Sequence, residues 1–456
     1  MSVAPLFRLK EDWEVTTLGD VAARGGGSIQ TGPFGSQLHA SDYVDQGIPS
    51  IMPQNITTDR ISEEGIARIT EEDAERLSKY RVRTGDIVYS RRGDVERRAL
   101  VREENDGWLC GTGCLKVSLG ESVVVPEYAA FYLSHPASKA WVVQHAVGAT
   151  MPNLNTSILS ALPFVLPPVN EQEQIANALS ALDDKIELNR RMNETLEEMA
   201  RALFRDWFVD FGPTRRQMGG ATDPASIMAH AFPSDKATTL ASLFPAKLGE
   251  NGVPEGWRRE PISELTTLLK RGISPKYADQ GCLVVNQRCI RRNSINFDLA
   301  RRNDVGLRDP KIKELKIGDV LVNSTGVGTL GRVATVRALP EKSSADSHVS
   351  IVRPDAVLVE PVLVGLLLED MQDLIADMGH GSTGQTELKP SVIGEIKVVL
   401  ADRELQRIFG LIVGPLRQKV DANNTENHTL AAFRDLLLPK LMSGEIRLKD
   451  LEAKAR

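Results

Sequence analysis

Cysteine, aromatic residues and long apolar runs are all scarce in this sequence. The 456 residues include four cysteines, and aromatic residues make up 5%. Cys110 and Cys114, like Cys282 and Cys289, lack the CxxC spacing of common zinc sites, so we expect buried free thiols and no metal site. No run approaches the roughly 18 apolar residues of a membrane span, and the first residues lack an apolar stretch of signal-peptide length. We therefore expect a cytoplasmic protein that does not contact a membrane.

Basic charge is not in excess either. The net charge is −6 and the isoelectric point is about 5.8. Residues 12–168 carry 14 Lys and Arg against 20 Asp and Glu, whereas residues 255–401 carry 20 against 19. A chain with this balance binds nucleic acid only if local arginine clusters or a partner supply the attraction for phosphates. The hydrophobic share of 41% is that of a globular protein, and the length fits two or three domains of about 150 residues each.

An internal repeat spans nearly half of the chain. Three blocks return in the same order and at similar separations in the second half: 13–20 at 257–265, 46–51 at 280–285, and 85–90 at 318–323. The units of solenoid repeats are only about 20–50 residues long. The period found here therefore indicates a duplicated pair of domains.

Each half begins with a mixed domain, predicted at residues 1–168 and again at 255–401. Short β-type runs bounded by glycine and proline, such as 86–89 and its counterpart 319–322, alternate with a few helical stretches. Between the halves, residues 212–254 are rich in Gly, Ala, Ser, Thr and Pro and predict a linker. The fold class we predict is α+β, with two β-rich globular domains related by a pseudo-twofold repeat.

Each half ends in a long helix, predicted at residues 169–211 and at 402–456, the latter including a C-terminal tail. Apolar or special residues recur at alternating steps of four and three from Ile175 to Leu203, which makes a seam of about four heptads. A helix with such a stripe cannot bury it alone. We therefore expect the two helices to pack against each other, antiparallel, as a coiled coil that separates the two mixed domains.

The second helix repeats this pattern with a weaker beginning. Its seam runs from Ile408 to Leu437, but Gly410, Gly414 and Pro415 fall in its first half. Proline removes a backbone hydrogen bond and clashes with the preceding turn, so we expect a kink or break there.

Asparagines occupy equivalent positions in the two seams, namely Asn189, Asn193, Asn423 and Asn427. A polar residue inside a coiled-coil seam lowers stability but fixes the register of the helices, and this is the role we predict for them. The alternative is that they are solvated where the helices splay apart.

No set of residues with catalytic spacing occurs. The histidines form no HExxH pattern, and there is no GxSxG elbow. Residues 326–333 resemble a phosphate-binding loop in glycine spacing but lack the Lys-Ser/Thr ending that holds phosphate and magnesium. Residues 166–169, Leu-Pro-Pro-Val, lack the polar group with which an amino-methyltransferase would hold the amine of a base. We predict that the chain is not an enzyme and binds no cofactor itself.

Several motifs, in this order and partly in duplicate, resemble the specificity (S) subunits of type I restriction-modification systems. The resemblance covers almost the whole chain and rests on Trp13 with Leu18-Gly19-Asp20, Gly32-Pro33-Phe34-Gly35-Ser36, Gly85-Asp86-Ile87-Val88 with Arg91-Arg92-Gly93, Leu166-Pro167-Pro168 with Glu171-Gln172 and Ile175-Ala176, Arg201-Ala202-Leu203-Phe204 with Phe208-Val209-Asp210-Phe211, and Leu441-Met442-Ser443-Gly444-Glu445-Ile446. The second half departs from the family at residues 271–275, Arg-Gly-Ile-Ser-Pro, where the Gly-Pro-Phe-Gly loop is missing.

This resemblance implies a targeting subunit used in phage defence. Two target recognition domains would each read one half of a split, asymmetric site in double-stranded DNA. The helices would set the spacer and dock two methyltransferase (modification) subunits, and restriction (helicase-nuclease) subunits would join them. S-adenosylmethionine, ATP and magnesium would bind to those partners and not to this chain. Two domains held at a fixed distance agree with the rule that half-site spacing reports protein geometry.

The same strand is followed by different loop chemistry in the two halves. Residues 90–93 are Ser-Arg-Arg-Gly, whereas residues 323–326 are Asn-Ser-Thr-Gly. Guanidinium groups suit guanine edges or phosphates, and amides and hydroxyls suit adenine or mixed contacts. We therefore predict that the two half-sites differ in sequence, with neutral divergence of the loops as the alternative.

Polar and basic residues on glycine-rich loops are the candidate DNA contacts. In the first domain they are Ser28, Gln30, Thr31, Ser36, Arg91, Arg92, Arg97, Arg98 and Asn153. In the second domain they are Arg271, Lys276, Gln287, Arg288, Asn323, Ser324, Thr325, Thr329, Arg332, Gln385 and Thr386. Loops are polar regardless of function, so simple solvent exposure is the alternative for each residue.

A second interpretation of the whole chain stays open at this point. The protein could be a stand-alone, two-headed DNA-binding regulator without enzymatic partners. The acidic total charge favours this less, because such a protein has to attract DNA phosphates unaided.

Overall fold

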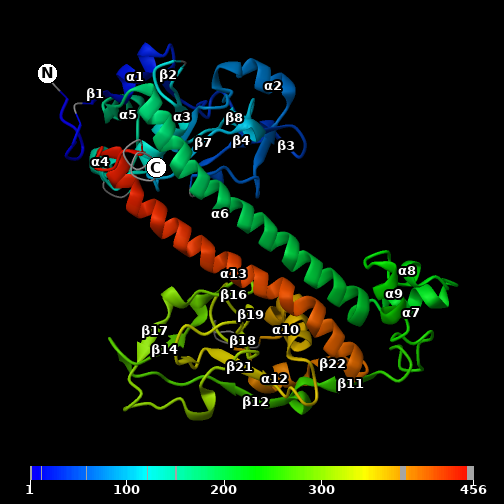
Figure 1. Cartoon of the computed structure of the whole chain (residues 1–456). Coiled ribbons are helices and arrows are strands. Elements are labelled where there is room, and N and C mark those ends of the chain that lie inside the picture. The colour runs from blue at the N-terminus through cyan, green and yellow to red at the C-terminus, as the bar shows by residue number, and fades with distance from the viewer. Residues whose placement is uncertain are drawn as a thin grey trace, which may run out of the picture. The chain divides into compact units, whose positions relative to one another are not determined.

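The structure, a computed structural model, is a mixture of helices and small sheets that forms two compact units (Figure 1). It describes residues 3–11, 13–57, 59–120, 122–148, 151–379 and 387–448. One unit comprises residues 1–188 with 426–456, and the other comprises residues 189–425. Each unit therefore combines a mixed domain with part of each of two long helices. The α+β class predicted from the sequence is confirmed.

Three small sheets build the mixed domain of the first unit. Their strand orders are β2-β9-β6-β7, β3-β5-β4-β8 and β1-β10. The strands are β1 (Glu14–Thr17), β2 (Ser28–Thr31), β3 (Tyr43–Val44), β4 (Ile48–Ile51), β5 (Ala67–Ile69), β6 (Ile87–Ser90), β7 (Arg98–Leu100), β8 (Leu109–Cys110), β9 (Cys114–Ser118) and β10 (Pro163–Leu166). All pairings are antiparallel except that of β4 with β8.

The mixed domain of the second unit repeats this topology. Its corresponding sheets are β12-β21-β18-β19, β13-β17-β14-β20 and β11-β22, and β14 pairs in parallel with β20 as β4 does with β8. The strands are β11 (Arg258–Pro261), β12 (Thr266–Arg271), β13 (Tyr277–Ala278), β14 (Cys282–Val285), β15 (Ile290–Arg291), β16 (Ser294–Ile295), β17 (Arg301–Asn303), β18 (Val320–Asn323), β19 (Val333–Thr335), β20 (Ser343–Ala345), β21 (Val349–Pro354) and β22 (Lys397–Leu400). The sequence repeat is thus a repeat of strand order.

Short helices cover these sheets, and proline begins several of them. The helices of the mixed domains are α1 (Leu18–Arg24), α2 (Glu71–Arg76), α3 (Pro126–Ser134), α4 (Pro136–His145), α5 (Thr156–Ser160), α10 (Pro361–Asp370), α11 (Gln372–Asp377) and α12 (Pro390–Glu395). Proline suits the first helical position because the amide hydrogen it lacks would have no partner there. The Tyr128 and Tyr132 hydroxyls of α3 donate to backbone oxygens of β10, each at 2.9 Å, and join helix and sheet.

The long helices are α6 (Val169–Phe204) and α13 (Arg403–Met442), and a π-helix at Arg205–Val209 continues α6. The break expected near Pro415 does not occur, since α13 runs through it. Leu405, Phe409 and Val413 on this part of α13 are fully buried. Burial of these side chains outweighs the intrinsic cost of proline, about 3 kcal/mol.

Contacts within each unit show that α6 and α13 are antiparallel. In the first unit Asp183 of α6 pairs with Arg434 of α13 at 2.7 Å, and Lys185 pairs with Glu426 at 3.4 Å. The partner's number falls as the number along α6 rises. Among the seam asparagines in the second unit, the Asn423 amide donates to Asn193 at 2.8 Å, and the Asn193 amide donates to the neighbouring Asn424 at 2.9 Å.

The four seam asparagines do not share one environment. Asn189 and Asn423 are fully buried, whereas Asn193 and Asn427 are half-buried. Solvation by splaying of the helices therefore does not describe the two buried residues. The role of all four in fixing the register stays a prediction.

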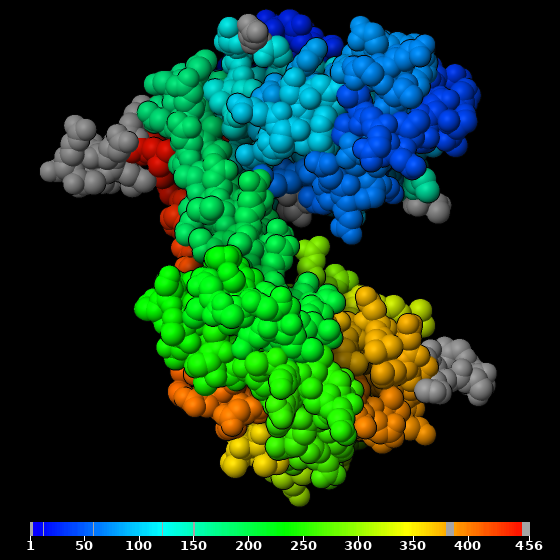
Figure 2. Space-filling model, turned by 90° about the vertical axis from the view of Figure 1, so that its right-hand side faces the viewer, coloured from blue at the N-terminus to red at the C-terminus, as the bar shows by residue number. Residues whose placement is uncertain are grey.

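The segment for which we expected a linker, residues 212–254, is folded. It contains α7 (Gly212–Met218), α8 (Pro224–Ile227) and α9 (Ser234–Ala241), and Figure 2 shows it as a closely packed bright green region of the surface. Its buried Leu240 and Phe244 belong to the same hydrophobic cluster as Trp207 and Phe409. The segment predicted as a linker is therefore part of the core of the second unit.

Arginine side chains join each mixed domain to the helices of its own unit. In the second unit Arg337 pairs with Glu197 of α6 at 3.2 Å and with Asp421 of α13 at 3.0 Å. Burial raises the pKa of the Asp421 carboxyl, and the charge of Arg337 opposes this shift. A second buried pair joins Arg417 of α13 to Glu369 of α10. These ion pairs give the domain a defined orientation on the helices.

Replacing the buried asparagine of the seam tests the polar contact between the helices. We expect Asn423→Ala to lower the free energy of unfolding by about 1–3 kcal/mol, because it leaves the Asn193 oxygen without its donor. Urea denaturation followed by circular dichroism measures the change. Asn177→Ala, at an exposed position of α6, is the control and should have little effect. Equal effects of the two substitutions would contradict a specific role for the contact.

Candidate nucleic-acid interface

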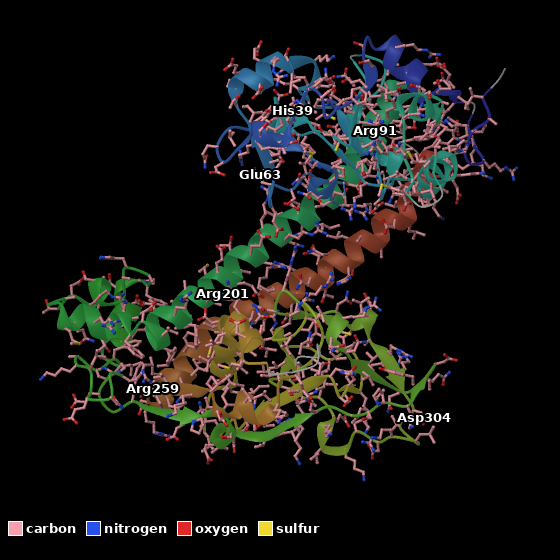
Figure 3. The ribbon with its side chains drawn as sticks, turned by 180° about the vertical axis from the view of Figure 1, so that it is seen from behind. His39, Glu63, Arg91, Arg201, Arg259 and Asp304 are labelled. Atoms are coloured by element: carbon pink, nitrogen blue, oxygen red, sulfur yellow. The ribbon has the colours of Figure 1, made fainter. Side chains whose placement is uncertain are left out.

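Three loops of the first domain meet where β6 ends. Arg91 follows β6 directly, and its backbone oxygen accepts from Leu154 N at 2.9 Å while its N–H donates to Gly113 O at 2.8 Å. Arg92 forms an isolated bridge with Asn153. The sequence reasoning named Arg91, Arg92 and Asn153 from segments far apart in the chain, and the structure brings all three together. Figure 3 labels Arg91 on the first domain.

The Gly-Pro-Phe-Gly-Ser loop lies against the same arginines. The Arg91 guanidinium is 5.8 Å from the centre of the Phe34 ring, and the Phe34 side chain is 53% exposed. At Gly32 the backbone passes so close to Gly111 that a Cβ atom would lie 2.1 Å from its oxygen, so the loop requires glycine there. The result is an exposed aromatic ring beside Arg91, which suits phosphate contact and base stacking. Phe34 was not among the predicted contacts, although its place in the loop motif could have indicated it.

The polar candidates on β2 and its loop are accessible to different degrees. Ser28 and Ser36 are exposed, and Gln30 and Thr31 are half-buried on the edge strand β2. The Gln30 amide donates to the Lys79 backbone oxygen at 2.6 Å. Gln30 therefore already has a structural role, whereas the two serines are available for an outside partner.

The two arginines that follow in the sequence have internal partners. Arg98 is 4% exposed and pairs with Asp59 at 2.6 Å, so the prediction that Arg98 contacts DNA is wrong for the side chain as the structure places it. It begins β7, in which all three residues are buried. Arg97 is exposed but pairs with Asp94 at 2.9 Å. Contact with DNA would require Arg97 to exchange this partner.

In the second domain the loop after β18 is held by a polar network. The Gln287 amide donates to the Thr325 backbone oxygen at 2.9 Å and to its hydroxyl at 2.6 Å. The same hydroxyl lies 2.8 Å from Nδ1 of His348, a residue that the sequence reasoning missed. Thr329 donates to the Thr325 backbone oxygen at 3.3 Å. Three of the predicted candidates, Gln287, Thr325 and Thr329, thus lie together at one loop.

Asn323 and Ser324 are not at the surface, which corrects their prediction as DNA contacts. Both are fully buried. The Asn323 amide donates to the Gln287 backbone oxygen at 3.1 Å, and the Ser324 hydroxyl shares a hydrogen bond of 2.6 Å with Ser350. Every residue of β18 is buried, so the accessible loop begins at Thr325. These two side chains shape the loop and do not face an outside partner.

The remaining predicted residues of the second domain fall into three groups. Lys276 and Arg288 are exposed. Arg271 pairs with Glu387 at 2.7 Å, and Arg332 donates to the Gly328 backbone oxygen at 2.8 Å, so both are engaged within the domain. Gln385 and Thr386 lie outside the described residues.

A group of basic side chains near β17 was missed by the sequence reasoning. Arg301 stacks on Tyr277, with its guanidinium 3.3 Å from the ring centre, and both residues are exposed. Further exposed basic residues of the same domain include Arg291, Arg292, Arg308, Lys311 and Lys316. The doublets at 291–292 and 301–302 are a visible signal of this charge in the sequence. They supply local basic charge that the acidic total conceals.

The chemistry of the described residues is that of binding. No group of three or more His, Cys, Asp or Glu side chains in this part of the chain is placed to hold a metal ion. The four cysteines are buried free thiols, as expected, and burial raises the pKa of the Cys110 thiol to about 12. Burial also raises the pKa of Asp346, whose carboxylate accepts from His348 N at 2.8 Å. No helix among the described residues has the length and apolar character needed to span a bilayer.

Comparisons with known proteins show which family this chain resembles. Residues 10–198 match the family described as the type I restriction modification DNA specificity domain. The chain is 25% identical over 413 residues to the specificity subunit of the type I restriction enzyme HindI of Haemophilus influenzae, which covers 81% of this chain and 88% of that protein. It is 23% identical over 459 residues to the MjaIX specificity subunit of Methanocaldococcus jannaschii, covering 97% and 96%.

A solved structure has the same fold. The crystal structure of the S subunit of a type I restriction-modification system from M. genitalium aligns with a TM-score of 0.58 at 18% identity, over 96% of this chain and 99% of that one. This likeness shows that the chain has the fold of that S subunit. The chain is thus similar, over most of its length, to the specificity subunits of type I restriction-modification systems.

Arg92 and Arg97 are close in the sequence, but Arg92 is accessible to a partner whereas Arg97 is paired with Asp94. We expect Arg92→Ala to weaken binding of the target duplex by about 1–3 kcal/mol, because Arg92 is exposed at the meeting point of three loops. Arg97→Ala, which removes an arginine already paired with Asp94, is the matched control and should change binding less. Fluorescence anisotropy at two salt concentrations measures both variants. A larger loss from Arg97→Ala would contradict this assignment.

Proposed function

We propose that this chain is the DNA-recognition subunit that directs a type I methyltransferase and restriction complex to a bipartite, asymmetric site. The observation that carries the proposal is the repeat of one strand order in two domains with different loops. Each domain has its own surface at the end of the equivalent strand, β6 or β18. Such a molecule would have two DNA-binding surfaces, and these would contact different base sequences.

The two loop surfaces support half-sites of different sequence. The first presents Arg91, Arg92 and Phe34, and the second presents Gln287, Thr325 and His348. Guanidinium groups make bidentate contacts to guanine, whereas an amide suits adenine. Because Asn323 is buried, the second surface offers the side-chain amide of Gln287 and not that of Asn323, which we first predicted.

The antiparallel helices have the properties of a spacer. They are 36 and 40 residues long, and arginine ion pairs attach the mixed domain of each unit to them, such as Arg60 with Glu187 in the first unit and Arg337 with Asp421 in the second. We infer that the helices set the length of the unread DNA between the half-sites. We also infer that they dock two methyltransferase subunits, to which the restriction subunits bind.

Chemistry belongs to those partners in this proposal. S-adenosylmethionine would bind to the methyltransferase subunits, and ATP with magnesium to the restriction subunits. In this chain the glycine-spaced loop at 326–331 is occupied by its own contacts, including Thr329 to Thr325 and Arg332 to Gly328. The loop has no lysine for a nucleotide phosphate. The protein would act in the cytoplasm, where the complex meets incoming DNA.

Mapping methylated adenines in cells with and without the gene tests this function. We expect a bipartite, non-palindromic motif to lose methylation when the gene is deleted and to regain it with the wild-type chain. Arg91→Ala with Arg92→Ala should relax or abolish methylation through one half-site, while Arg97→Ala should restore the wild-type motif. A palindromic motif, or methylation that is indifferent to the gene, would contradict the proposal.

A further inference from the structure

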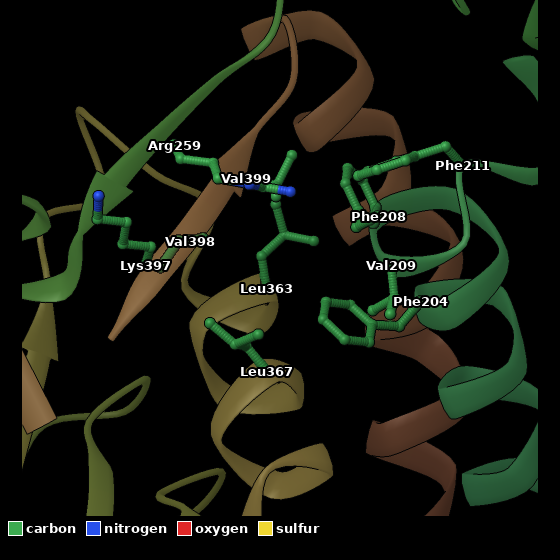
Figure 4. A pocket seen from close by; sticks show the side chains of 10 residues that line it. All are labelled: Phe204, Phe208, Val209, Phe211, Arg259, Leu363, Leu367, Lys397, Val398 and Val399. Carbon is green, nitrogen blue, oxygen red and sulfur yellow. The ribbon is translucent and has the colours of Figure 1, made fainter. Parts of the chain in front are cut away.

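A pocket lies at the end of α6 in the second unit and is lined almost entirely by apolar side chains (Figure 4). Leu363 and Leu367 of α10 form one side, and residues 204–211 at the end of α6 form the other. Its volume is about 230 Å³. Val209, in the π-helix, is 39% exposed, so the pocket is accessible from solvent.

Because the chain has an internal repeat, the first unit contains a surface equivalent to this pocket. In the first unit, α3 corresponds to α10, with Tyr132 at the position of Leu367. The end of α13 corresponds to the end of α6, with Ser443 at the position of Val209. The first unit therefore contains the same two walls, built from a helix of the mixed domain and the end of a long helix.

In the first unit the chain itself occupies the space between these walls. Phe7 lies 5.8 Å from Tyr132 between ring centres, and the Lys10 N–H donates to the Ser443 backbone oxygen at 2.9 Å. Leu6, Phe7 and Leu9 pack against the core of the unit. A short apolar segment, anchored by a backbone hydrogen bond, thus covers this surface.

The corresponding stretch of the second half takes another path. The residues before Trp257 fold back on themselves, since Gly249 N donates to Val253 O at 2.8 Å and Glu255 N donates to Lys247 O at 3.0 Å. Trp257 keeps its place, stacked on Phe208 at 5.8 Å, as Trp13 packs on the first core. Val253, at the position of Leu9, is buried in the core of the second unit, but no residue of 249–256 lines the pocket.

The lining of the pocket also includes two positively charged side chains. Arg259 of β11 and Lys397 of β22 line it, and neither forms an ion pair within the described part of the chain. In the first copy the strand positions equivalent to these are Val15 and Pro163. Two cations at the edge of an apolar pocket favour a carboxylate beside the apolar group that enters it.

We propose that this pocket, defined by Leu363, Leu367, Val209, Arg259 and Lys397, binds an extended segment of a partner protein that carries apolar side chains next to an acidic residue. The segment lies beside Leu367 as Phe7 lies beside Tyr132 in the first unit. The apolar side chains fill the space between α10 and the end of α6, and the carboxylate pairs with Arg259 and Lys397. The proposal does not depend on DNA recognition.

The buried thiols of the protein allow a direct measurement on the full-length chain. All four native cysteines are buried, so Asp210→Cys, at an exposed position next to the pocket but outside its lining, introduces a single reactive thiol for an environment-sensitive fluorophore. The probes are two synthetic peptides, one with the sequence of residues 3–11 and one with the same sequence carrying Arg8→Glu and Lys10→Glu. Leu411→Cys, exposed on α13 and outside the pocket lining, places the same label on a control surface.

We expect the acidic peptide to shift the emission of the label at position 210 in a saturable way, with an affinity at least tenfold higher than that of the native-sequence peptide. Arg259→Glu with Lys397→Glu, introduced together, should reduce this affinity at least tenfold. Arg258→Glu is the matched control because its side chain points to the other face of β11, and it should change the affinity less than twofold. Thermal unfolding verifies that each variant is folded.

Three outcomes would overturn the proposal. One is the absence of a saturable change with either peptide at position 210, and another is an equal change at position 411. The third is tighter binding of the native-sequence peptide accompanied by a concentration-dependent dimer in sedimentation, which would identify a second copy of this chain as the occupant.

Discussion

The burial of two apolar seams is the constraint on which the rest of this structure depends. Neither α6 nor α13 can cover its own stripe, and each unit solves this by pairing the two helices against its mixed domain. In the first unit Ile175 and Leu179 of α6 share a core with Leu438 and Leu441 of α13. Residues from distant parts of the chain therefore have to come together before either unit has a complete core.

A repeated framework leaves the loops free to differ. The strand order is the same in both mixed domains, so the ends of β6 and β18 are equivalent places built by equivalent packing. One end carries Arg91 and Arg92, and the other carries the Gln287–Thr325–His348 network. Core residues maintain the fold in both copies, and the loops are able to change what they contact without loss of stability.

Polar groups inside the molecule perform a different task from those on the loops. Arg337 contacts both long helices, and Arg417 reaches Glu369 in the core of the second unit. A buried ion pair adds little net stability but makes other orientations costly, because each would leave a charge unpaired. Such contacts suit a protein in which the direction of a domain has to be maintained.

The sequence by itself determined the duplication, the two long helices and the positions of the loops, because heptad spacing, glycine and proline act locally. It also indicated Arg91, Arg92 and Asn153 as candidate contacts, and the structure brought them together. Only the tertiary structure decided that Arg98, Asn323 and Ser324 face inward, that residues 212–254 fold, and that α13 continues through Pro415. These features depend on which distant segments pack against each residue, and local sequence does not contain that information.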